Sequence, residues 1–238
     1  MTGHLEREVK LDADPDLELP DLNGAVPGLV AMARPTLDLD ATYFDAGDGR
    51  LLEAGVTLRR RTGEGTRWTV KLPSHRPAPA AGSGGAAESS AAAAAAAVHR
   101  REIDVHDIGL AVPAEVAELV APWLGKADLV AVARLVSHRR RQALGVDPTG
   151  AGALAELDDD LVVVHVVGDG SEARAEAGPV PDAPVGRFRE IEVEQADADQ
   201  ADAGPVVAAV VARLLAAGAR PAPTTSKLAR ALELAARR

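Results

Sequence analysis

The chain has 238 residues and a formal net charge of −10. The negative charge argues against general binding to nucleic acids, and no apolar run reaches the roughly 18 residues of a membrane span. There is no cysteine, which excludes disulfides and thiolate metal sites and fits a reducing, cytoplasmic location. We therefore expect a single cytoplasmic domain over residues 1–238, with no membrane partner and no specific nucleic-acid partner.

Residues 5–11 predict the first strand, in which charge alternates strictly. Glu6, Glu8 and Lys10 occupy every second position, and mostly apolar residues lie between them. Because the side chains of a strand alternate between its faces, the two carboxylates and the ammonium share one face. A solvent-exposed polar face is the ordinary interpretation of such a strand. The recurrence of the pattern in later strands favours a buried site instead.

The next segment is irregular and leads into a charged hairpin. Residues 15–39 contain four prolines and predict short turns and loops, and residues 37–44 predict a strand. Residues 56–61 and 67–72 predict a hairpin around the turn at 63–65. The cations on one face of this hairpin are Arg59, Arg61, Arg67 and Lys71. They repel each other unless anionic groups lie among them, so this face predicts an anion site.

A low-complexity segment interrupts the strands. Residues 75–97 are rich in proline, alanine, glycine and serine and end in seven consecutive alanines. This composition predicts a flexible insertion between two strands. Residues 98–105 then resume the sheet, with Arg100, Glu102 and Asp104 in phase.

The second half of the chain predicts a helix over 113–124, followed by further charged strands. Residues 129–144 predict one or two strands and hold the densest basic run, at 138–141. Residues 154–167 and 188–195 predict two acidic strands. Their in-phase acids are Glu156, Asp158 and Asp160, then Glu190, Glu192 and Glu194.

Two helices are expected at the C-terminal end, over 205–217 and 225–237. A Thr or Ser caps the second helix, and Lys227 lies in its first turn. The helix dipole disfavours a lysine at that place. We therefore expect a specific acidic partner for Lys227.

These elements amount to an α+β fold, with about eight mostly antiparallel strands and about three helices. Closing the sheet into a barrel would turn the charged faces inward. Carboxylate pairs suit hard cations such as Mg²⁺ or Mn²⁺, while arginine and lysine bind phosphate oxygens. No GxxxxGK[ST] motif is present, so side chains and not a P-loop would hold phosphate.

The ordered set of motifs resembles the CYTH superfamily, also called triphosphate tunnel metalloenzymes. It opens with Glu6-x-Glu8-x-Lys10. The later motifs, in family order, are Tyr43-Phe44-Asp45, Gly55-Val56-Thr57-Leu58-Arg59-Arg60-Arg61, Trp68-Thr69-Val70-Lys71-Leu72-Pro73, Arg101-Glu102, Arg139, Glu156-x-Asp158, Glu190-x-Glu192-x-Glu194 and Ser226-Lys227-Leu228. The resemblance spans residues 5 to about 232. It implies an eight-stranded antiparallel β-barrel, or tunnel, with flanking helices, which binds a triphosphate together with a divalent metal.

The resemblance also implies roles for individual residues. The implied ligands of Mg²⁺ or Mn²⁺ are Glu6, Glu8, Glu156, Asp158, Glu190 and Glu192. The implied phosphate-binding residues are Lys10, Arg59, Arg61, Lys71, Arg139 and Lys227. The implied catalytic residues are Glu8, Lys10 and Glu192, with Glu8 or Glu192 orienting or deprotonating the attacking water.

One departure from the family pattern leaves a choice open in the basic strand. Many relatives have a tryptophan near residue 142, where this chain has Gln142. This departure leaves the register of the basic strand open. The alternatives to Arg139 are Arg134, Arg140 and Arg141.

The function that this resemblance implies is a metal-dependent triphosphatase acting on inorganic triphosphate or a small organic triphosphate, such as thiamine triphosphate or a nucleoside triphosphate. The alternatives are a class IV-type adenylyl cyclase and a non-catalytic module that binds polyphosphate or nucleotides. Bacterial CYTH domains are often followed by a helical CHAD domain. None follows Lys227, so we expect either a stand-alone form or a part of a longer chain.

Overall fold

The computed structural model describes residues 1–73, 98–147, 152–166, 183–196, 203–222 and 226–237. The insertion expected at 75–97 lies outside these residues. Among the residues described, no helix is long and apolar enough to cross a lipid bilayer.

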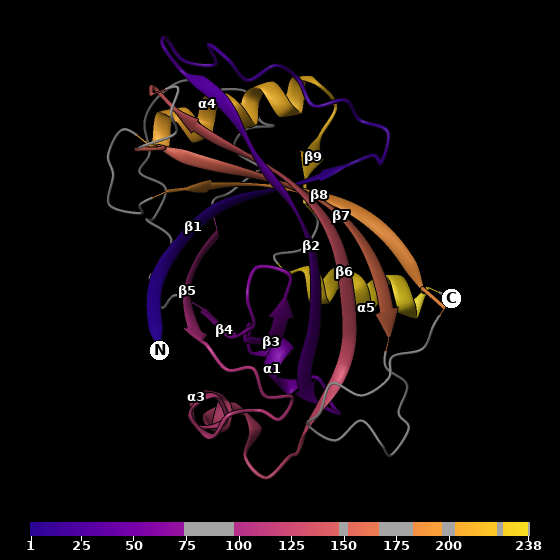
Figure 1. Ribbon diagram of the computed structural model, residues 1–238. Helices are drawn as coiled ribbons and strands as arrows, with labels where there is room; N and C mark the ends of the chain where they lie inside the picture. Colours follow the sequence, from indigo (N-terminus) through magenta and orange to yellow (C-terminus); the bar gives the residue numbers. More distant parts are fainter. Residues whose placement is uncertain (74–97, 148–151, 167–182, 197–202, 223–225, 238) are drawn as a thin grey trace, which may run out of the picture.

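Eight long strands form a closed antiparallel barrel (Figure 1). They are β1 (Thr2–Ala13), β2 (Val30–Ala46), β3 (Thr57–Thr62), β4 (Arg67–Pro73), β5 (Val98–Val105), β6 (Leu129–Gly145), β7 (Ala155–Val166) and β8 (Gly186–Gln195). The strand order is β5-β4-β3-β2-β6-β7-β8-β1, and β1 pairs again with β5 to close the ring. A two-residue strand, β9 (Arg220–Pro221), adds to the edge of β1. The predicted eight-stranded antiparallel barrel is thus confirmed.

The outer face of the barrel packs under helices because it carries the apolar half of each alternation. On β1, Val9 and Leu11 are buried against α4 (Ala203–Ala216), which contributes Val206 and Val210 to the same cluster. This burial of aliphatic side chains stabilises the wall at roughly 25 cal/mol per Å² of apolar surface. In Figure 1, α4 lies across one end of the barrel and α3 (Ala114–Leu124) lies near the other.

The side chains of the β3–β4 hairpin point to the two faces of the sheet as the sequence predicts. Leu58, Trp68 and Val70 are fully buried in a cluster that includes residues of α3. The Trp68 ring packs on Phe44 with 5.1 Å between the ring centroids. The turn requires glycine at Gly63, which has φ 111° and whose added Cβ would lie 2.1 Å from a backbone oxygen. The charged side of the hairpin therefore faces the interior.

The strand β2 is longer than predicted, because turns were expected up to residue 36 and the strand begins at Val30. Pro35, which cannot donate to a ladder, lies in a register shift between Arg34 and Leu37. At such an irregularity a missing N–H costs little, so the strand continues through the proline. Residues 129–145 form one strand, β6, which settles the choice between one strand and two.

Two further helices complete the fold. The short α1 (Arg50–Glu53) lies between β2 and β3. The last helix, α5 (Lys227–Ala236), begins after Ser226, whose Oγ accepts a hydrogen bond from the Ala229 N–H at 3.0 Å. This confirms a serine cap. Leu228 packs into a cluster on β6 and β7, and this packing fixes where Lys227 points.

Candidate functional site

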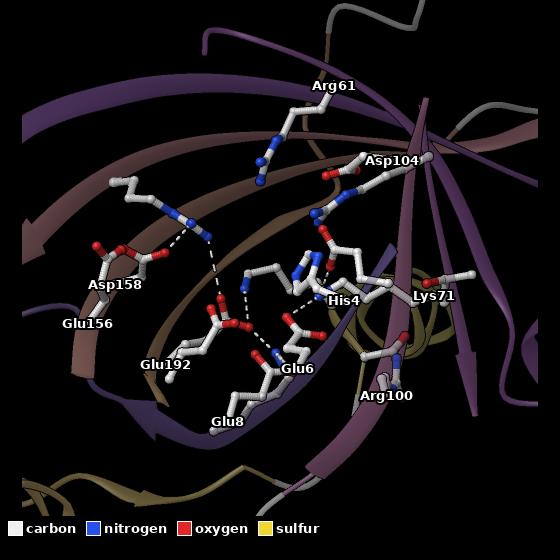
Figure 2. A pocket seen from close by; sticks show the side chains of 18 of the residues that line it. His4, Glu6, Glu8, Arg61, Lys71, Arg100, Asp104, Glu156, Asp158 and Glu192 are labelled. Atoms are coloured by element: carbon white, nitrogen blue, oxygen red, sulfur yellow. Dashed lines mark hydrogen bonds and ion pairs between the residues drawn. The ribbon is translucent and has the colours of Figure 1, made fainter. Parts of the chain in front are cut away.

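The inward faces of the strands line a charged cavity of about 230 Å³ (Figure 2). All six side chains predicted to bind phosphate line it, namely Lys10, Arg59, Arg61, Lys71, Arg139 and Lys227. Five of the six acids predicted to bind metal also line it, namely Glu6, Glu8, Glu156, Asp158 and Glu192. The sixth, Glu190, is fully buried in the wall behind them.

Lys10 is the centre of the acidic side of the cavity. Its Nζ lies 3.1 Å from Glu8 Oε1 and 3.7 Å from Glu190 Oε1, and it forms a closer ion pair with Glu192. Strand register explains the closest contact, because Lys10 and Glu192 are direct partners across β1 and β8. Burial is the largest influence on Lys10 and lowers its pKa below the ordinary value, although the neighbouring carboxylates oppose this.

Lys227 enters the same group from α5. Its Nζ lies 2.8 Å from Glu190 Oε1 and 2.8 Å from Glu192 Oε1, and 3.2 Å from Asp160 Oδ2. Burial would lower the pKa of Lys227, but the carboxylates of Glu190 and Asp160 outweigh it and raise the pKa to about 12. Lys227 therefore has the acidic partners that its unfavourable place in the helix predicts.

Arg139 crosses from β6 to the acids of β7 and β8. Its Nη2 donates to Asp160 Oδ2 at 2.7 Å and to Glu192 Oε2 at 3.4 Å, and its Nη1 donates to Asp158. Burial acts against the charge, yet Asp160 and Asp158 raise the pKa of Arg139 above its ordinary value. The guanidinium is therefore a permanent cation inside the barrel.

The structure separates the alternatives to Arg139 by strand face. Arg134 donates to Asp40 at 2.5 Å and Arg140 donates to Asp159 at 2.5 Å, and neither arginine lines the cavity. Arg141, two residues from Arg139, does line it. The register of β6 thus brings two arginines into the cavity, because positions 139 and 141 share a face.

On the opposite wall, Lys71 of β4 is held between two acids. Its Nζ lies 2.5 Å from Glu6 Oε1 and 2.8 Å from Glu102 Oε2. Burial alone would raise the pKa of Glu102, but the opposite effect of Lys71 and Arg59 is larger and lowers the pKa to about 2. Glu102 received no role from the sequence, although its phase with Arg100 and Asp104 placed it on a charged face.

Arg59 is a cavity cation with few partners. Its Nη1 lies 3.5 Å from the Tyr43 hydroxyl, and its buried Nε has no hydrogen-bond partner. A buried guanidinium without a full set of acceptors is costly unless a ligand supplies them. The side chain is therefore suited to an anion that enters the cavity.

Comparison with known proteins agrees with this geometry. A family model for the CYTH domain matches residues 4–205. The chain belongs to the CYTH domain family. This confirms the resemblance read from the motifs, and CYTH proteins are typically enzymes that act on triphosphates and depend on a metal.

The curated relatives are longer than this CYTH chain. An uncharacterized protein of Mycobacterium tuberculosis, Rv2226, is 34% identical over 237 residues, which cover 96% of this chain and 40% of the relative. The chain thus spans about two fifths of the length of the relatives it matches.

Solved structures share the CYTH fold at low identity. A Bacillus halodurans protein described as a candidate adenylate cyclase has a TM-score of 0.51 and 14% identity, and the match covers 97% of this chain and 98% of that protein. HpAC1 from Hippeastrum, named as an adenylyl cyclase with a dominant triphosphatase activity, has a TM-score of 0.50 and 16% identity, and covers 96% and 95% of the two chains. These likenesses show the fold alone.

A further acid of the CYTH barrel, Glu194, also lines the cavity. It is the direct partner of Glu8 across β1 and β8. Burial, followed by repulsion from Glu6 and Glu8, raises the pKa of Glu194 to about 8. The sequence placed Glu194 in phase with Glu190 and Glu192 but assigned it no role. Only the strand register shows that it faces Glu8.

The carboxylates of this CYTH barrel provide suitable donor atoms for a divalent metal. Glu6 Oε2 and Glu190 Oε2 are buried without a hydrogen-bond partner, and hard cations such as Mg²⁺ prefer carboxylate oxygens. No three acidic or histidine side chains of the described residues are arranged as a ready metal site. The lysines instead hold the acids in ion pairs. The donor set therefore fits a metal that competes with the chain's own ammonium groups.

Proposed function

We propose that this CYTH domain is a metal-dependent triphosphatase that hydrolyses inorganic triphosphate or a small organic triphosphate inside the barrel. The observation that carries the proposal is the interleaving of buried cations and carboxylates around Glu192, which contacts Lys10, Lys227 and Arg139. A bound phosphate chain would take the place of the carboxylates as the partner of these cations. A bound metal ion would take the place of the cations as the partner of the carboxylates.

The cations are proposed to hold the phosphates. Arginine presents a planar fork to phosphate oxygens, and lysine acts as a compact charge. The residues proposed for this role are Lys10, Arg59, Arg61, Lys71, Arg139 and Lys227. They come from five strands or helices around the cavity, so a bound chain contacts cations along its length.

The acids are proposed to hold Mg²⁺ or Mn²⁺. The residues proposed as ligands are Glu6, Glu8, Glu156, Asp158, Glu190 and Glu192, to which the register adds Glu194. When bound, the metal neutralises charge on the phosphate oxygens and makes phosphorus more susceptible to attack. Glu156 lies at the edge of this set, since its side chain is 40% exposed and pairs with Arg141.

Water is proposed to attack the terminal phosphorus, with Glu8 or Glu192 orienting it; the phosphoanhydride bond to that phosphorus breaks, and orthophosphate and the shortened phosphate chain are released. Burial raises the pKa of Glu8, but Lys10, Lys71 and Lys227 lower it to about 2. Glu8 is thus ionised at neutral pH and is a weak base, which suits orientation of the water by hydrogen bonding. Lys10 lies beside both of these carboxylates. Its ammonium would therefore be next to the reacting phosphorus and would stabilise the charge on the transferred phosphoryl group.

The proposal is tested by measuring phosphate release from tripolyphosphate, thiamine triphosphate and ATP, each with Mg²⁺ or Mn²⁺. We expect release from at least one of them, and its loss when a chelator is added. No release from any of the three with either metal contradicts the proposal. Formation of cyclic AMP from ATP would instead indicate a cyclase, and tight polyphosphate binding without turnover would indicate a binding module.

A further inference from the structure

The turn between β3 and β4 places an acid across one mouth of the cavity. Glu64 lies at the tip of this turn, between Gly63 and Gly65, both of which have positive φ. Its Oε2 accepts a hydrogen bond from Arg67 Nη2 at 3.3 Å, and its Oε1 accepts one from Arg141 Nη1 at 3.2 Å. Arg141 belongs to β6, which β2 separates from β3 in the sheet. Glu64 therefore connects two walls that are not neighbours in the barrel.

Two of the arginines at this mouth, Arg61 and Arg67, have fewer acceptors than their charge requires, whereas Arg141 also pairs with Glu156 and Asp158. Arg61 and Arg67 are direct partners across β3 and β4, and both line the cavity. Like charges directly opposite on one sheet face are destabilising. Arg67 Nε is buried without a hydrogen-bond partner. Within the described part of the chain, Arg61 forms no side-chain hydrogen bond or ion pair, although only 8% of it is exposed. Figure 2 shows Arg61 pointing into the cavity.

The Glu64 carboxylate occupies the position where an anion would satisfy two of these guanidinium groups. Its own side chain is 43% exposed, and the arginine side chains it contacts are 20% and 23% exposed. An ion pair at this exposure contributes about 1 kcal/mol or less, so an anion of higher charge can replace it. A phosphate group presents more acceptor oxygens than a carboxylate and matches the arginine fork.

We propose that Arg67 and Arg141 form an outer phosphate subsite beside Arg61, and that Glu64 occupies this subsite until a phosphate chain longer than triphosphate displaces it. The inference rests on the proposed function, since it extends the phosphate path from the inner cations to the mouth. Arg141 is two residues from Arg139 on the same face of β6, and Arg67 is the direct partner of Arg61 across β3 and β4, so each outer cation adjoins an inner one.

The chemistry of this mouth favours an inorganic chain over a nucleobase. Recognition of a base usually relies on an aromatic or apolar surface for stacking. Among the described residues that line the cavity, Tyr43 is the only phenylalanine, tyrosine or tryptophan and is only 4% exposed, and His4 is the one other side chain with an aromatic ring. The outer subsite therefore suits linear inorganic polyphosphate.

The test is a binding titration by calorimetry with tripolyphosphate, tetrapolyphosphate and longer linear polyphosphate, in the presence of a chelator so that no turnover occurs. We expect Arg67→Gln to weaken binding of the longer chains about tenfold more than that of tripolyphosphate, as expected for loss of one charge-assisted contact. Glu64→Ala should tighten binding of the longer chains. Arg101→Gln is the matched control, because Arg101 is exposed on the outer face of β5.

A loss that is equal for all chain lengths in Arg67→Gln overturns the inference, as does weaker long-chain binding in Glu64→Ala. Circular dichroism of each variant excludes misfolding as the cause. The two proposals fail separately. A dependence on chain length without any phosphate release supports the subsite and contradicts the triphosphatase. Turnover of tripolyphosphate without a dependence of binding on chain length supports the triphosphatase and contradicts the subsite.

Discussion

The ammonium of Lys227 lies 2.8 Å from Glu192 Oε1, the same oxygen that Lys10 approaches from β1. The helix α5 thus contributes directly to the charge balance of the barrel, in addition to packing on its wall. Two lysines from opposite ends of the chain share one carboxylate. The ends of the sequence are therefore joined through the proposed phosphate site.

Replacing Lys227 with methionine should destabilise the protein. The change leaves Asp160, Glu190 and Glu192 without one of their cations in a buried site. This loss should lower the free energy of unfolding by about 3 kcal/mol. Urea unfolding at neutral pH measures the difference. Lys126→Met is the control, because Lys126 is exposed after α3. Equal stability of the two variants would show that the ion pairs of Lys227 contribute nothing.

Replacing Glu8 with glutamine should abolish metal-dependent phosphate release while the fold is kept. Glutamine preserves the shape but removes the negative charge that a divalent cation requires, and a loss of about a hundredfold or more in turnover is expected. The readout is phosphate release from tripolyphosphate, together with thermal unfolding. Glu18→Gln is the control, because Glu18 is exposed in the segment after β1. Retained activity in Glu8→Gln contradicts the role assigned to this residue.

Replacing Lys10 with methionine should strengthen metal binding even as it removes turnover. Lys10 pairs with Glu8 and Glu192, so its removal takes one cation from each carboxylate, leaving Glu192 with Lys227 and Arg139, and takes a positive charge away from the metal. We expect about tenfold tighter binding of Mn²⁺, since a nearby charge contributes a few kcal/mol at most. Electron paramagnetic resonance of free Mn²⁺ gives the affinity without any activity assay. Weaker binding than in the wild type would show that Lys10 does not compete with the metal.

Much of this site could be predicted from the sequence because alternation along a strand is a local property. Glu6, Glu8 and Lys10 share a face wherever β1 lies, and the same holds for Arg59 and Arg61. The family resemblance supplied the closure that turns these faces inward. Lys227 was marked by its unfavourable position in the first turn of a helix.

The parts that could not be predicted depend on how strands pair across the barrel. That Glu194 faces Glu8, and that Glu64 reaches Arg141, follows from register and closure between segments far apart in the sequence. The same is true of β2, where Pro35 predicts a loop but lies in a register shift. Local propensity has no information on a partner strand.

Replacing Glu194 with glutamine should stabilise the metal-free protein at alkaline pH. Burial and the charges of Glu6 and Glu8 raise the pKa of Glu194 from 4.5 to about 8. The folded state therefore binds this proton more tightly than the unfolded state. The resulting contribution to stability is complete below pH 4.5 and is lost as the pH rises through about 8. Glutamine stays neutral throughout and avoids this loss.

The advantage of Glu194→Gln over the wild type should grow by about 1–2 kcal/mol between roughly pH 6 and pH 9, with allowance for partial solvent exposure. Denaturant unfolding across this range, with a chelator present, measures it. Glu115→Gln removes an exposed carboxyl on α3 and should follow the wild type at every pH. Parallel stability curves for Glu194→Gln and the wild type would show that Glu194 is not held protonated among its neighbours.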